Sequence, residues 1–97
     1  MKFSDQDLQK QIILFFQPYD PVKIGLFGSY VRGEHNSESD LDILYSIRKE
    51  VSLLDLVRMH RQLSEILGVK VDLVSERSLR NELLKKYIKQ DLKIIYE

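Results

Sequence analysis

Short apolar runs of strand length alternate with longer amphipathic segments along the chain, and this alternation restricts the possible folds more than any other feature. Leu8, Ile12 and Phe15 recur at helical spacing, after Ser4 and Asp7 in the spacing of a capping box. The pattern predicts an α/β (α+β) fold in which helices cover a mixed four-stranded sheet. We expect helices at 4–17, 29–32 (a single turn), 52–67 and 78–89, and strands at 22–27, 40–45, 69–74 and 92–96.

The order of these elements brings several polar residues to one rim of the sheet. If the first two strands are antiparallel, Ser29 and Asp40 meet at the same edge. The segment 52–67 is long enough to be a crossover helix, so the third strand can run parallel to the second. Asp72 would then lie level with Asp40 and Asp42.

Composition limits the class of protein. The 97 residues, 43% hydrophobic and 31% charged, predict one soluble domain over 1–97. No apolar run approaches the roughly 20 residues of a membrane span, and the first ten residues do not resemble a signal peptide. Cysteine is absent, so we expect a cytoplasmic protein without disulfides. Fifteen acidic and fifteen basic residues argue against broad affinity for nucleic acid.

The three aspartates predict a divalent metal site. Asp40 and Asp42 alternate along a strand and therefore face the same side, and we expect Asp72 to join them. Like charges gathered in a cleft repel one another unless a cation lies between them. Carboxylates alone suit Mg²⁺, whereas a chain with no cysteine and two histidines is poorly equipped for zinc.

The turn at Gly28 and Ser29 predicts a phosphate site beside these acids. Glycine allows an anion to approach the backbone, and the N–H groups that open a helical turn point toward it. Arg32 is either a further phosphate ligand or a structural partner for one of the acids, and the sequence leaves both interpretations open.

The pattern G-S-x₂-R-G-x₆-D-x-D, followed by an aspartate in V-D-L-V, resembles the minimal nucleotidyltransferases of the DNA polymerase β superfamily. The resemblance covers the whole chain and implies the nucleotidyltransferase fold. It implies transfer of a nucleoside monophosphate, most often AMP from ATP, to an acceptor hydroxyl. The matching positions are Gly28, Ser29, Arg32, Gly33, Ser39, Asp40, Asp42 and Asp72.

The resemblance also implies roles and partners. Asp40 and Asp42 would bind Mg²⁺, and Asp72 would bind metal and activate the acceptor, while Gly28, Ser29, Arg32 and Ser39 would contact the nucleotide. Such proteins are often antitoxins that pair with a HEPN-domain toxin, in some cases by adenylylating one of its tyrosines. The partner implied here is therefore a HEPN-domain toxin.

Several alternatives stay open. The chain could be a non-catalytic antitoxin that masks its partner, or a transferase for small molecules. It could bind RNA through Lys85, Lys86 and Lys89, and the last strand could pair with another chain in a homo- or hetero-oligomer. We expect His60 to be exposed beside the core, without a catalytic role.

Overall fold

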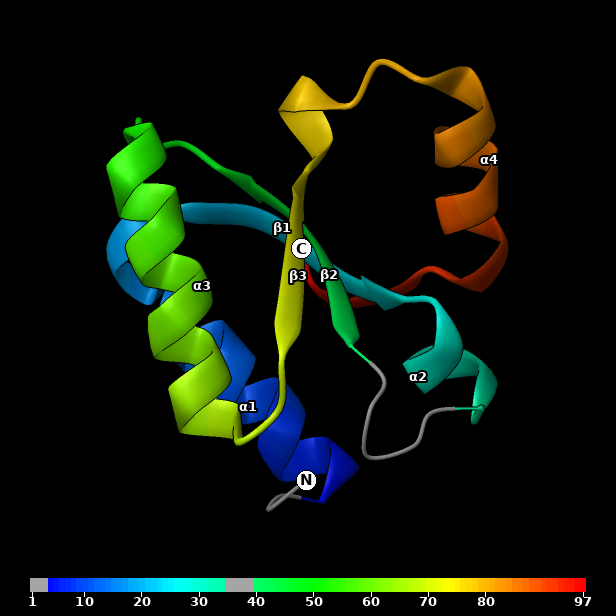
Figure 1. Cartoon of the computed structure of the whole chain (residues 1–97), viewed down its shortest axis with the longest axis horizontal. Coiled ribbons are helices and arrows are strands. Elements are labelled where there is room, and N and C mark those ends of the chain that lie inside the picture. Colours follow the sequence, from blue (N-terminus) through cyan, green and yellow to red (C-terminus); the bar gives the residue numbers. More distant parts are fainter. Residues whose placement is uncertain (1–3, 35–39) are drawn as a thin grey trace.

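The computed structural model describes residues 4–34 and 40–97 (Figure 1). It confirms the predicted fold class, a mixed four-stranded sheet with helices on both of its faces. The helices are α1 (Asp5–Phe16), η1 (a 3₁₀ helix, Gln17–Tyr19), α2 (Ser29–Arg32), α3 (Leu53–Leu67), η2 (3₁₀, Glu76–Ser78) and α4 (Glu82–Asp91). The strands are β1 (Pro21–Phe27), β2 (Leu41–Ile47), β3 (Val71–Ser75) and β4 (Lys93–Tyr96).

The strands lie in the order β3-β2-β1-β4. β1 is antiparallel to both β2 and β4, and β3 is parallel to β2, with α3 as the crossover between them. The carboxyl end of β1 therefore meets the amino ends of β2 and β3 at one rim. This is the arrangement that the order of the elements predicted.

Several boundaries differ from the sequence prediction, and two of the differences have a clear local cause. The third strand begins at Val71, because Gly68 in the left-handed region (φ 69°) ends α3 and two residues of connection follow. The last helix begins at Glu82, because Asn81 caps it by accepting a hydrogen bond from the Leu84 N–H (3.0 Å). Ser78 instead ends η2, so the predicted start of this helix at Ser78 was wrong.

The main core lies between the sheet and the pair α1 and α3, which lie together on one side of it in Figure 1. α1 contributes Leu8, Ile12 and Phe16, and α3 contributes Met59, Leu63 and Leu67, which recur at every fourth residue. On the other face a smaller cluster of Phe27, Leu44 and Ile88 packs under α4. The core residues of the α1/α3 face are Leu8, Ile12, Phe16, Ile24, Leu26, Leu41, Ile43, Tyr45, Ile47, Met59, Leu63, Leu67 and Val71.

The outer edge of β3 is covered by side chains of α3. The Val71 N–H donates to Ser64 Oγ (3.2 Å) and the Leu73 N–H donates to His60 Nε2 (3.2 Å). The other ring nitrogen of His60 lies 3.0 Å from the Leu56 carbonyl, so Nδ1 carries the proton and donates it. His60 is thus half-buried and structural, which corrects the expectation that it is exposed.

Within residues 4–34 and 40–97, no helix combines the length and the apolar character that crossing a membrane requires.

Candidate active site

The rim where β1 ends begins with a turn that requires glycine. Gly28 has φ 80° and ψ −155°, and a Cβ placed there would overlap the carboxylate of Asp42. The Gly28 carbonyl then accepts hydrogen bonds from the N–H groups of Val31 (3.1 Å) and Arg32 (3.2 Å), which winds α2. Gly28 is buried and Ser29 is half-buried, and the close approach of Gly28 to the Asp42 carboxylate places the turn against Asp42.

Asp42 and Asp72 lie on the same face of the sheet. Asp42 and Asp72 are direct partners in the parallel register of β2 and β3, and Asp42 is also paired with Phe27 of β1. Asp40 immediately precedes β2 and is half-buried, as is Asp42, whereas Asp72 on the edge strand is exposed. The register therefore brings Asp72 level with Asp42, at the place where the Gly28–Ser29 turn begins.

Burial, which is the largest cause, and the negative charges of Asp72 and Asp40 together raise the pKa of Asp42 to about 6, and the positive charge of Arg32 opposes this rise. The three carboxylates are thus close enough to interact electrostatically. A cation between them would relieve this repulsion and favour the charged form of Asp42.

These residues fit Mg²⁺, although they do not form a closed ligand cage. Among the described residues, no group of three or more His, Cys, Asp or Glu side chains is arranged to hold a metal ion. Mg²⁺ is usually held by one or two carboxylates, with waters and substrate phosphates as the remaining ligands. The carboxylate oxygens next to the Gly28–Ser29 turn provide that kind of open site.

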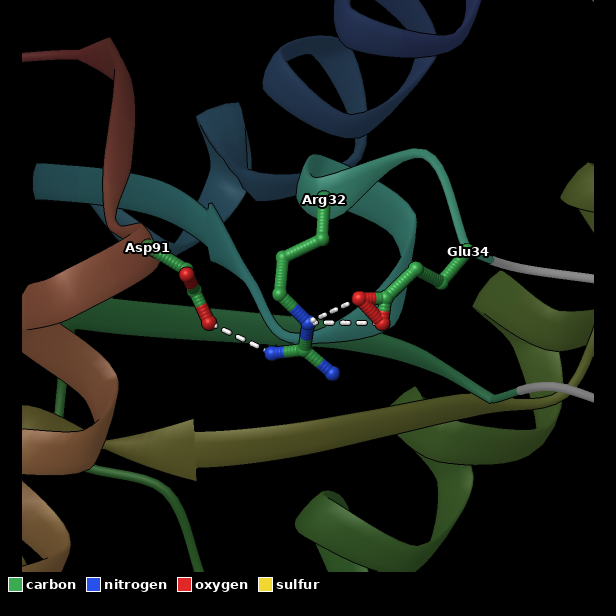
Figure 2. Close-up of polar contacts among 3 residues, drawn as sticks. All are labelled: Arg32, Glu34 and Asp91. Atoms are coloured by element: carbon green, nitrogen blue, oxygen red, sulfur yellow. Dashed lines mark hydrogen bonds and ion pairs between the residues drawn. The ribbon is translucent and has the colours of Figure 1, made fainter.

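Arg32 is held by acids outside the predicted site (Figure 2). Its Nε lies 3.2 and 3.3 Å from the carboxylate oxygens of Glu34, and a terminal guanidinium nitrogen lies 2.5 Å from Asp91 Oδ2. A hydrogen bond with Tyr87, followed by those with Asp91 and Glu34, raises the pKa of Arg32. The ion pair with Asp91 joins α2 to the end of α4.

Sequence reasoning missed Glu34, Tyr87 and Asp91. Glu34 is two residues from Arg32 and could have been suggested by its charge alone. Asp91 is 59 residues away, and no local pattern marks it as a partner. Ser39, which matched the family pattern, lies outside the described residues.

Residues 7–95 match the family model described as "Nucleotidyltransferase domain", and the chain therefore belongs to this family of enzymes. The resemblance inferred from the sequence is confirmed at this level.

The chain is similar to named protein adenylyltransferases. It is 40% identical over 85 residues to "Putative protein adenylyltransferase MJ1217" of Methanocaldococcus jannaschii, covering 88% of this chain and 87% of that protein. It is 41% identical over 68 residues to "Protein adenylyltransferase MntA" of Thermococcus cleftensis, covering 70% of this chain and 69% of that protein.

Two examples show that solved structures share this fold. One, described as "Structure of putative minimal nucleotidyltransferase", has a TM-score of 0.74 and 32% identity, covering 91% of this chain and 89% of that one. The other, described as "Crystal structure of the toxin-antitoxin with AMP-PNP", has a TM-score of 0.79 and 26% identity, covering 91% of this chain and 72% of that one.

Proposed function

We propose that this protein is a Mg²⁺-dependent transferase that moves AMP from ATP to a hydroxyl group of a partner protein. The observation that carries the proposal is the direct pairing of Asp42 with Asp72, next to the glycine turn that Asp42 itself packs against. Relatives named as protein adenylyltransferases support the choice of AMP and of a protein acceptor.

In this proposal the acids at the rim bind the metal, and the turn beside them binds the phosphates of the nucleotide. Asp40 and Asp42 hold Mg²⁺, with Asp72 as a further ligand. The backbone N–H groups after Gly28 and the hydroxyl of Ser29 hold the outer phosphates, joined by Arg32 and Ser39. When bound, Mg²⁺ neutralises the charge that develops on the phosphate oxygens.

The reaction itself is a displacement at the α-phosphate. The acceptor oxygen forms a bond to the α-phosphorus, and the bond from that phosphorus to the bridging oxygen breaks. Pyrophosphate leaves with the bonding electrons, and Asp72 accepts the proton of the acceptor hydroxyl. The exposed position of Asp72 on the edge strand leaves room for a protein acceptor to reach it.

We propose a HEPN-domain toxin as partner, with a tyrosine as the acceptor and the cytoplasm as the compartment. The similar structure described as a toxin-antitoxin with AMP-PNP supports a toxin partner and an adenine nucleotide. The chain would then act as the antitoxin of the pair.

Transfer of label tests this proposal. ATP labelled at the α-phosphate is incubated with Mg²⁺, this protein and its proposed HEPN-domain partner, and the label on each protein is measured. We expect label on the HEPN protein, its loss when EDTA is added, and its loss in Asp42→Asn. Asp20→Asn, which changes charge equally in an exposed ion pair with Arg48, should retain transfer. Absence of label with the active wild-type pair would contradict the proposal.

A second candidate is a non-catalytic antitoxin that only masks its partner. The open metal site and the engagement of Arg32 by Glu34 and Asp91 favour it. A double variant, Asp40→Asn with Asp42→Asn, separates the two functions. If it still neutralises the toxin completely, masking is sufficient, and if neutralisation is lost while binding remains, transfer is required.

A further inference from the structure

A cavity of about 250 Å³ lies beneath α4, on the face of the sheet that carries Asp42 and Asp72. Its floor is apolar and includes Leu44 and Ile88, which are 3% and 2% exposed. One side of its rim is an ion pair in which Lys23 Nζ lies 2.8 Å from Glu76 Oε2. The cavity thus combines an apolar floor with a hydrogen-bond donor and an acceptor placed side by side, and Lys85 and Lys89 of α4 also line it.

The cavity follows directly after the acids along this face. Leu44 is two residues beyond Asp42, so it faces the same side about 6.7 Å further along β2. Leu44 and Ile88 belong to one buried cluster with Phe27, the residue before Gly28. Along this face the Gly28–Ser29 turn therefore comes first, then the acids, and then the cavity.

A nucleoside triphosphate has its groups in the same order: outer phosphates, α-phosphate, ribose and base. We propose that this cavity receives the base of the nucleotide, with the Lys23–Glu76 pair binding its polar edge. The proposal rests on the function proposed above and adds where the nucleoside lies. Ring nitrogens and exocyclic groups alternate as acceptors and donors along the edge of a base, which complements a neighbouring ammonium and carboxylate. The ring faces would lie on Leu44 and Ile88.

The base suits this cavity better than the acceptor protein does. α4 covers the cavity, and the pair of Arg32 with Asp91 ties the end of α4 to α2. A covered space of this size accepts a planar ring more readily than a loop of a folded protein. The acceptor has a separate approach at Asp72, which is exposed on the edge strand.

Two probes separate the base from the phosphates: AMP-PNP, which has both, and inorganic tripolyphosphate, which has only phosphates. Their binding is measured by calorimetry with Mg²⁺ for the full chain and for the double variant Lys23→Met with Glu76→Gln. The double variant leaves the net charge unchanged, so general attraction to phosphate is preserved. Loss of two hydrogen bonds to the base should weaken AMP-PNP binding roughly tenfold. Tripolyphosphate binding should stay within about twofold of the wild type.

The exposed pair Asp20 and Arg48 provides a matched control. Asp20→Asn with Arg48→Gln removes one ion pair without changing the net charge, and binding of both probes should be unaffected. A second readout needs no variant: AMP-PNP should shift the methyl NMR signals of Leu44 and Ile88 in the wild-type protein, and tripolyphosphate should not.

Three results would overturn the proposal: unchanged AMP-PNP affinity in the Lys23/Glu76 variant, an equal loss for both probes, or methyl signals that AMP-PNP does not move. These results leave nucleotide binding itself intact and so leave the proposed function standing. If the wild-type protein binds neither probe, the proposed function fails and the base site fails with it.

Discussion

The two faces of the sheet differ in how completely they are packed. The face toward α1 and α3 holds a cluster of thirteen buried residues, whereas the face toward α4 holds three, among the described residues. The acids and the glycine turn lie at the rim of the less packed face. In this small domain, one face supplies most of the apolar burial and the other remains open enough to bind charged ligands.

The difference has an electrostatic cause. A carboxylate enclosed among apolar side chains would take up a proton or require a partner, because desolvation disfavours its charge. Even on the open face, partial burial and the neighbouring charges of Asp72 and Asp40 together raise the pKa of Asp42 to about 6. The packed face could not hold three neighbouring charged aspartates, which the proposed metal site requires.

The largest effect on stability is expected on the packed face. Leu63 of α3 is fully buried, so Leu63→Ala should lower the free energy of unfolding by about 2–5 kcal/mol, through lost burial and the cavity left behind. Leu83→Ala is the matched control, because Leu83 lies on α4 and is 77% exposed. Urea unfolding measures both. Similar losses in the two variants would contradict the contrast between the faces.

The largest effect on activity is expected on the open face. Asp42→Asn removes a charge that the proposed metal requires and should lower the rate of label transfer roughly 10²–10³-fold. The asparagine side chain has nearly the same shape, so the fold should persist, which circular dichroism can verify. Transfer at the wild-type rate by the folded variant would remove Asp42 from the catalytic site.

Asp42→Asn, which should lower activity, should raise the stability of the protein when no metal is bound. The pKa of Asp42 is about 6 in the folded state and 3.8 as its ordinary value, so the folded state binds the proton more tightly. Its stability therefore falls as the pH rises from about 4 to beyond 6, because the folded protein must lose a proton that it holds more tightly than the unfolded chain does. Without metal at pH 7.5, Asp42→Asn should raise the free energy of unfolding by about 1–2 kcal/mol, allowing for partial exposure.

Urea unfolding at two pH values in EDTA checks this prediction. At pH 3.5 the wild-type protein and Asp42→Asn should be nearly equal in stability, and at pH 7.5 the variant should be the more stable. Saturating Mg²⁺ should reduce the difference at pH 7.5 by stabilising only the wild-type protein. A variant that is less stable than the wild type at pH 7.5 would show that Asp42 is not under electrostatic strain.

How much could be predicted from the sequence depended on the range of the interactions. Helical spacing and capping marked α1 and α3, and the chain order gave the parallel β2–β3 pair that brings Asp72 level with Asp42. The contact of Arg32 with Asp91 depends on where α4 packs, and the sequence carries no local sign of it. The role of His60 was missed for the same reason, since its partner is a backbone N–H of a strand edge.

The smallest effect is expected where α2 meets the end of α4. Asp91→Asn replaces the ion pair that Arg32 makes between α2 and α4 with a neutral contact (Figure 2). Because the pair is partly exposed, we expect only a twofold to fivefold increase, roughly, in amide hydrogen exchange in α4. Exchange in α3 should not change, since α3 packs on the opposite face.

Asp20→Asn is the control for this measurement, because its ion pair with Arg48 is more exposed and lies away from α4. It should leave exchange in α4 unchanged. Faster exchange in both α3 and α4 after Asp91→Asn would mean that the two faces unfold as one unit. An effect confined to α4 would show that the helix over the open face can loosen while the packed face stays folded, so that nucleotide could enter without disturbing the main core.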